Sequence, residues 1–459
     1  LTERMFLMNK KFENIDFAGL DRKRKIHIIL PVFLVSVIAF IDRVNIAYAG
    51  MTMSQQLDWL TPEIFGAGAG MFFLGYFFFE IPGSLIAAKF DACKWIARIM
   101  FTWGVVCGLL AFMQSPLHFY LFRFLLGACE ASLYPVIYAV LFPRWFLGRE
   151  RAAAISLMLT SLLIAAIIGA PIAGVLLELN LFGLYGWQCL FLLEAVPALV
   201  FTFIFLFWVK DRPEKVNWLT PLEKEYLNET IAAEEEEKHK TKKYTIWQAL
   251  TDKKVWRLCV IYFTWITGFW GFNFWMPQVL KGVSGWSPAL VGVAIIFPMG
   301  AALIAQVIIG HHSSKTGEIR WHIAGCMFLG AFGLICAPFI HTGILSLIFI
   351  SITAIGVYSA MGTWWSVPTT FLSGAAAAGA TAMINSIANL GGYLGPYMLG
   401  VIKQTTGSTD GGYFALGGML IVSGLVMLTL PKTQSVRSAE MVTEEKPYVS
   451  ADLNEGGDF

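Results

Sequence analysis

Residues 26–49 read IHIILPVFLVSVIAFIDRVNIAYA, an apolar run that carries an adjacent acid and base, Asp42 and Arg43. A helix needs about 20 mainly apolar residues to cross a membrane, because it rises about 1.5 Å per residue through a hydrocarbon layer about 30 Å thick. This run is long enough. The sequence therefore predicts a first transmembrane helix that brings two ionisable groups into the membrane, where such groups are costly and usually functional.

The rest of the chain repeats this pattern. Of its 459 residues 57% are hydrophobic and 14% are charged, whereas a soluble domain has about 25% charged residues. The predicted fold class is therefore an all-α membrane protein with twelve transmembrane helices in two six-helix bundles. The predicted spans are 26–49, 65–88, 95–114, 117–141, 151–178, 188–209, 255–280, 288–310, 322–341, 344–371, 376–403 and 411–430.

Five parts follow from this division. They are an N-terminal segment at 1–25, a first bundle at 26–209, a linker at 210–254, a second bundle at 255–431 and a tail at 432–459. In the linker, Thr220-Pro221-Leu222-Glu223 is a capping box that predicts a helix from Pro221 to about 234–237. Two six-helix bundles joined by a long loop favour halves that rock about a substrate site near the bilayer midplane.

Basic residues alternate between the two sides of the membrane. Lys and Arg precede the first span and follow the second and fourth, whereas loops 50–64 and 179–187 contain neither. By the positive-inside rule, the N-terminal segment, the linker and the tail are cytoplasmic. An even number of spans also places both termini on one side. The expected location is the bacterial inner membrane.

The charges inside the spans are the strongest functional signal. Counting along the helices places Asp42 and Arg123 at a similar depth, where they could pair, and places Glu130 on the face of Arg123 two turns deeper. A nearby Arg favours the ionised acid and burial favours the protonated one, which is the balance that proton coupling requires. An unbalanced Arg suits an anionic cargo. The alternative is two structural salt bridges.

Other candidates are less specific. Trp365 follows a second Trp and precedes Ser366-Val367-Pro368 inside a span, which favours contact with the cargo. Glu80 and Glu194 are further intramembrane acids, for which pairing or gating is the preferred interpretation. The sequence has no metal-ligand spacing, nucleophile–base pair or phosphate loop. We therefore expect no enzyme activity, no metal site and no cofactor other than a coupling proton.

Several segments occur in a characteristic order: Ile41-Asp42-Arg43-Val44-Asn45-Ile46, Gly75-Tyr76 with Ile81-Pro82-Gly83, Arg123-Phe124-Leu125-Leu126-Gly127 with Glu130-Ala131, Asp211-Arg212-Pro213-Glu214, Asn273-Phe274-Trp275-Met276-Pro277-Gln278, and Asn385-Ser386-Ile387 with Asn389-Leu390-Gly391-Gly392. With them the chain resembles the anion:cation symporter family of the major facilitator superfamily over nearly its whole length. Within that family it looks closest to the hydroxyphenylacetate, tartrate and rhamnonate permeases. The resemblance implies proton-driven uptake of organic carboxylates.

The resemblance also implies roles for individual residues. Asp42 and Glu130 would carry protons, and Arg43, helped by Arg123, would bind the carboxylate. The remaining substrate-binding candidates are polar or aromatic side chains: Tyr76, Asn273, Trp365, Asn385 and Asn389. The expected partners are a small organic anion and the lipid bilayer, with no nucleic acid and a monomer as the working unit.

Some positions depart from the family pattern. Ala88 and Ser314 stand where the superfamily's loop motif has Asp, and Asp91 stands where it has Gly, so we expect a different balance between conformations. Leu162 replaces a Gln of the sugar-acid branch, which favours a less polar or aromatic acid. Efflux of amphipathic compounds and uncoupled carboxylate transport are the alternative functions.

Overall fold

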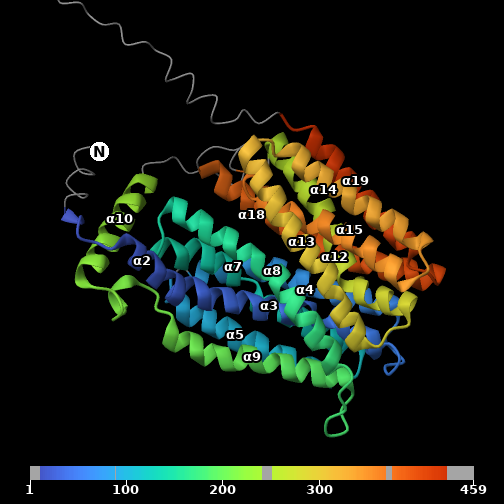
Figure 1. Ribbon diagram of the computed structural model, residues 1–459. Helices are drawn as coiled ribbons and strands as arrows, with labels where there is room; N and C mark the ends of the chain where they lie inside the picture. The colour runs from blue at the N-terminus through green and yellow to red at the C-terminus, as the bar shows by residue number, and fades with distance from the viewer. Residues whose placement is uncertain (1–10, 88, 240–250, 369–374, 432–459) are drawn as a thin grey trace, which may run out of the picture.

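The computed structural model describes residues 11–87, 89–239, 251–368 and 375–431, which form helices and turns with no strand (Figure 1). The N-terminal half consists of α3 (Leu30–Met53), α4 (Pro62–Ala87), α5 (Ala92–Leu109), α6 (Pro116–Glu130), α8 (Gly148–Leu176) and α9 (Gly186–Trp208). The C-terminal half consists of α12 (Lys253–Ser284), α13 (Pro288–Thr316), α14 (Arg320–Cys336), α15 (Gly343–Ser359), α16 (Met361–Trp364), α18 (Ala375–Thr406) and α19 (Asp410–Leu428).

The predicted twelve-helix membrane fold is confirmed. Ten helical segments among the described residues are long and apolar enough to cross a membrane. The two that complete the set, α12 and α18, have 32 residues each. These two helices carry the polar residues Asn273, Asn385 and Asn389, and both pack against the opposite half of the molecule. Their lower apolarity therefore has a physical reason, since they face the other half rather than lipid.

The fourth predicted span is not one continuous α-helix. The helix α6 ends at Glu130, and the chain continues as α7 (Leu133–Val136), a π-helical turn at Ile137–Leu141 and a 3₁₀ turn at Phe142–Arg144. Pro135 explains the break, because proline has no N–H to donate and its ring clashes with the carbonyl group four residues earlier. The tenth span is interrupted in a similar way, between Ser359 and Met361. The first break places Glu130 at a helix end.

Among the described residues the two halves meet mainly along three helix pairs, α3 with α12, α4 with α18 and α8 with α13. Glycines allow close approach here: a Cβ atom on Gly66 would lie 2.4 Å from the carbonyl oxygen of Pro396, and one on Gly174 would lie 2.5 Å from that of Pro288. Nearby, the Lys281 ammonium donates to the carbonyl oxygen of Met51 at 2.8 Å. The halves are therefore in direct contact where α4 and α13 begin.

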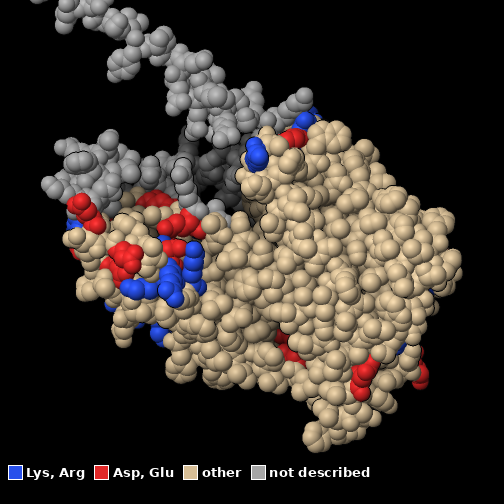
Figure 2. Space-filling model, in the orientation of Figure 1, with Lys and Arg blue, Asp and Glu red and all other residues tan. Residues whose placement is uncertain are grey.

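Charged side chains gather at the other end of the molecule, which we call the charged end (Figure 2). It includes α2 (Phe17–Arg24) and the linker helix α10 (Pro221–His239). The predicted capping box is confirmed: the amide of Thr220 donates to Glu223 Oε2 at 2.7 Å, and the amide of Glu223 donates to Thr220 Oγ1 at 3.2 Å. Lys23 pairs with Glu223 at 2.9 Å. The linker helix is thus attached to the N-terminal half.

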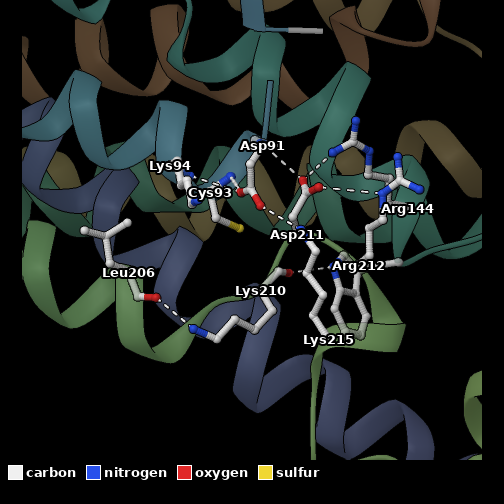
Figure 3. Close-up of polar contacts among 11 residues, drawn as sticks. Asp91, Cys93, Lys94, Arg144, Leu206, Lys210, Asp211, Arg212 and Lys215 are labelled. Carbon is white, nitrogen blue, oxygen red and sulfur yellow. Dashed lines mark hydrogen bonds and ion pairs between the residues drawn. The ribbon is translucent and has the colours of Figure 1, made fainter. Parts of the chain in front are cut away.

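Asp91 is the N-cap of α5 at the charged end (Figure 3). It accepts hydrogen bonds from the amides of Cys93 at 3.0 Å and Lys94 at 3.2 Å, and it pairs with Lys215 at 2.9 Å. Burial raises the pKa of Asp91, but the Lys215 ammonium and the two amides outweigh burial and hold that pKa below its ordinary value. A carboxylate at this position suits the positive end of a helix. Ala88, the other departure in this loop, lies outside the described residues.

Asp211 joins the same network from the segment that follows α9 (Figure 3). It accepts a hydrogen bond from the amide of Ala92 at 3.0 Å and pairs with Arg144. Ligand atoms of Asp91, Cys93 and Asp211 lie within 4.8 Å of one another, which is compact enough for a metal ion. Both carboxylates already have cationic partners, so we assign this group a structural role in joining three loops of the N-terminal half.

Candidate functional site

Arg43 is the centre of the site. It lies on α3, is 9% exposed, and its guanidinium forms an ion pair with Glu130 at the end of α6. Four aromatic rings surround it, with centroids at 5.0, 5.5, 5.7 and 5.9 Å from the guanidinium carbon: those of Phe72, Tyr76, Tyr134 and Trp270. Three of these belong to the N-terminal half and Trp270 belongs to the C-terminal half. Arg43 is therefore at the boundary between the halves.

Asp42 points away from this centre, because adjacent residues on a helix project about 100° apart. Its Oδ2 atom accepts a hydrogen bond from Trp103 Nε1 of α5 at 2.9 Å, and the residue is 1% exposed. Arg123 donates to the carbonyl oxygens of Ala69 at 3.0 Å and Arg43 at 3.5 Å. The expected pairing of Asp42 with Arg123 is not made among the described residues, since the two side chains face different helices.

Glu194 is a second acid beside Asp42. It lies on α9, is 5% exposed, and neither carboxylate oxygen has a hydrogen-bond partner among the described residues. It is close enough to Asp42 for an electrostatic interaction. Two buried carboxyl groups without a basic partner are costly unless at least one is neutral. Both acids are recognisable in the sequence as charges inside spans, but their proximity is not, because α3 and α9 are distant in sequence.

Glu80 connects the halves on the other side of Arg43. It lies on α4 one turn after Tyr76, and its two carboxylate oxygens accept hydrogen bonds from the side-chain amides of Asn385 at 2.8 Å and Asn389 at 3.2 Å. Both asparagines lie on α18 of the C-terminal half. Arg43 is within electrostatic range of Glu80. The structure therefore brings three of the substrate-binding candidates, Tyr76, Asn385 and Asn389, together with Glu80 near Arg43.

The two remaining candidates differ in position. Trp365 is half-buried and makes an edge contact with Tyr262, at 5.9 Å between ring centroids. Tyr262 is within electrostatic range of Glu80, so this aromatic pair borders the site. Asn273 is buried inside the C-terminal half, where it donates to the carbonyl oxygen of Phe269 at 2.7 Å and accepts from the hydroxyl of Tyr358 at 2.6 Å. Two partners in its own half therefore engage its amide.

Two packed helical halves with buried charges and aromatic rings at their boundary define a membrane transporter rather than an enzyme. The chain matches the Major Facilitator Superfamily model over residues 32–396, and it belongs to that superfamily. The inward open conformation of the xylose transporter XylE from E. coli has the same fold, with a TM-score of 0.69 at 15% identity over 90% of this chain and 99% of that one. The protein is a multi-pass membrane transporter of a small organic molecule.

Two curated relatives cover nearly the same length. A protein of Agrobacterium vitis described as a putative tartrate transporter is 42% identical over 92% of this chain and 94% of its own. A quinolone resistance transporter of Acinetobacter baumannii is 32% identical over 89% of this chain and 95% of its own. The names of these two relatives refer to different kinds of cargo, so the names alone do not identify the cargo of this protein.

Proposed function

We propose that the protein takes up a small organic carboxylate, an aromatic or hydroxy acid, by proton symport across the bacterial inner membrane, working as a monomer by alternating access. The observation that carries the proposal is the Arg43–Glu130 ion pair at the boundary between the halves. A guanidinium binds a carboxylate through two parallel hydrogen bonds, so Arg43 suits the carboxylate of a cargo as well as that of Glu130.

The two carboxylates compete for one cation. When the cargo engages Arg43, Glu130 loses its partner in a site where it is 1% exposed. A carboxyl group buried without a cation is more stable with its proton. Cargo binding therefore favours protonation of Glu130, and release of the proton restores the ion pair with Arg43. This exchange couples one anion to at least one proton.

The surroundings of Arg43 bear on the type of acid. Four rings lie around the guanidinium, so the planar group of an aromatic acid would find stacking partners there. The amides of Asn385 and Asn389 would serve the hydroxyls of a hydroxy acid. The name of the relative from Agrobacterium vitis agrees with the second class. Both classes share the carboxylate that Arg43 requires.

Drug efflux is the second candidate. The name of the Acinetobacter baumannii relative and the aromatic contacts that Phe40 and Phe73 make with Trp270 across the boundary support it. An amphipathic cation would not compete with Glu130 for Arg43, so efflux leaves the buried Arg43 without a role. For this reason we prefer carboxylate uptake.

Transport by the purified protein in liposomes tests the proposal. We would measure uptake of tartrate and of hydroxyphenylacetate with and without an inward proton gradient, and efflux of a fluoroquinolone in parallel. Accumulation of either acid that a protonophore abolishes is the expected result. Equal rates with and without the gradient would indicate an uncoupled facilitator. Transport of the fluoroquinolone alone would replace the proposal with efflux.

A further inference from the structure

Glu80, from the N-terminal half, occupies a carboxylate-binding site that the C-terminal half provides. The amide nitrogens of Asn385 and Asn389 each donate to a different oxygen of this one carboxylate, at 2.8 and 3.2 Å. The two asparagines are four residues apart on α18, so their side chains lie on one face of the helix. Two converging donors at this spacing form a site for a carboxylate or for neighbouring hydroxyl groups.

The position of Glu80 is unusual for a purely structural acid. The side chain is 8% exposed, and no Lys, Arg or His among the described residues pairs with it. Among the described residues its side-chain hydrogen-bond partners are the two amides from the opposite half, so these bonds must break whenever α4 and α18 separate at this level. Arg43 is near Glu80 but does not pair with it directly, and a carboxylate whose hydrogen bonds come from neutral donors is easier to displace than one in a direct ion pair.

The site formed by the two amides lies close to Arg43. Tyr76 lies one helical turn before Glu80 on α4, and its ring centroid is 5.5 Å from the guanidinium carbon of Arg43. Tyr76 thus lies beside Arg43, and the two amides bind the acid one turn further along the same helix. In the present conformation the protein's own carboxylates hold both places, Glu130 at Arg43 and Glu80 at the amides.

We propose that Glu80 competes with the cargo for the side-chain amides of Asn385 and Asn389. In the empty site Glu80 accepts their hydrogen bonds, and a second polar group of the cargo displaces it when the cargo binds. This inference rests on the proposed carboxylate transport and narrows the cargo to acids with a second acceptor group, either a hydroxyl or another carboxylate. A simple monocarboxylate engages Arg43 alone and leaves Glu80 in place. Glu80 is thus a specificity-determining residue, and it acts through the two amides.

The substitution Glu80→Gln tests this. Glutamine keeps the size of the side chain but offers one acceptor oxygen instead of two, so it competes less well for the amides. Binding to the purified protein would be measured by calorimetry, with tartrate as the acid that has further acceptors and butyrate as the acid that has none. We expect Glu80→Gln to bind tartrate about 3- to 10-fold more tightly, the equivalent of about one net hydrogen bond, and to bind butyrate as the wild type does.

Two further variants make the outcome decisive. Glu63→Gln, an exposed acid in the first turn of the same helix, is the matched control and should bind both acids as the wild type does. Adding Asn385→Ala to Glu80→Gln should remove the gain for tartrate. Suppose that the wild type binds both acids through Arg43. If Glu80→Gln then binds tartrate no more tightly than the wild type does, the inference about Glu80 is overturned and the proposed function is left intact. A wild type that binds neither acid would overturn both.

Discussion

The indole Nε1 of Trp103 donates a hydrogen bond of 2.9 Å to Asp42 Oδ2, and this bond keeps the acid on the α5 side of α3, whereas Arg43 lies at the boundary between the halves and pairs with Glu130. The other carboxylate oxygen, Oδ1, has no hydrogen-bond partner among the described residues. Trp103 is therefore the principal polar contact of a fully buried acid. Adjacent residues of one helix thus serve two different parts of the molecule.

Replacing Trp103 with Phe should destabilise the protein. The ring is largely kept, but a buried acid loses its donor, which costs about 1–3 kcal/mol. Trp187→Phe is the matched control, because Trp187 is also buried and its Nε1 has no hydrogen-bond partner among the described residues. Thermal unfolding in detergent should therefore show a larger loss for Trp103→Phe. Equal losses would mean that the hydrogen bond contributes nothing beyond packing.

Arg43→Lys should weaken binding of tartrate about 10-fold or more, because the ammonium keeps the charge but loses the planar fork that matches a carboxylate. Calorimetry on the purified protein measures this directly. Arg98→Lys is the control: Arg98 is exposed on α5 and stacks at 4.1 Å over Trp95, away from the boundary between the halves. An Arg43→Lys variant with unchanged affinity would remove Arg43 from the binding site.

Glu130→Gln should separate transport from its driving force. The amide cannot take up and release a proton, so accumulation of tartrate against its gradient should stop, whereas exchange of internal for external tartrate should continue. Both are measured in liposomes with labelled tartrate, and Glu63→Gln again provides the control. Persistent proton-driven accumulation by Glu130→Gln would show that another acid carries the coupling proton, with Asp42 and Glu194 the next to test.

The attachment of the linker helix should depend on pH. Burial raises the pKa of Glu223, but the hydrogen bonds from Lys23 and Thr220 outweigh burial and place that pKa below its ordinary value. A lowered acid pKa contributes stability that is present above about pH 4.3, the unfolded value for Glu, and is lost as the pH falls through the folded value. The first turn of α10 should therefore lose protection from hydrogen exchange below about pH 4.

In Glu223→Gln the same turn should exchange faster at neutral pH and respond less to acid, because the pair with Lys23 is already absent. The effect is small, below about 1 kcal/mol, since the Lys23 side chain is 37% exposed. Glu214→Gln, at an exposed acid for which the described residues provide no ion pair, should behave as the wild type. If protection of this turn from hydrogen exchange did not depend on pH in the wild type, the role given to the Lys23–Glu223 pair would be wrong.

Apolar run length was sufficient to predict the twelve spans, since a helix must satisfy its backbone hydrogen bonds within itself to cross lipid. The capping box at Thr220 is also a signal carried by neighbouring residues, and it was sufficient to predict that α10 starts at Pro221. The candidate set around Arg43 was also largely identified from residue type, because charges and amides are rare inside spans. Depth along each helix, however, could not decide which side chains meet.

Partner choice was decided by tertiary structure. The sequence is compatible with a pair between Asp42 and Arg123. In the structure, however, the rotation of α3 directs Asp42 toward Trp103 and allows Arg43 to form an ion pair with Glu130. The bond from Glu80 to Asn385 and Asn389 joins residues from opposite halves, and Pro135 ends α6 just after Glu130. Hydrophobicity and helix signals are local and can be read along the chain. Which charges face one another depends on how helices distant in sequence pack and rotate, and only the folded molecule fixes that.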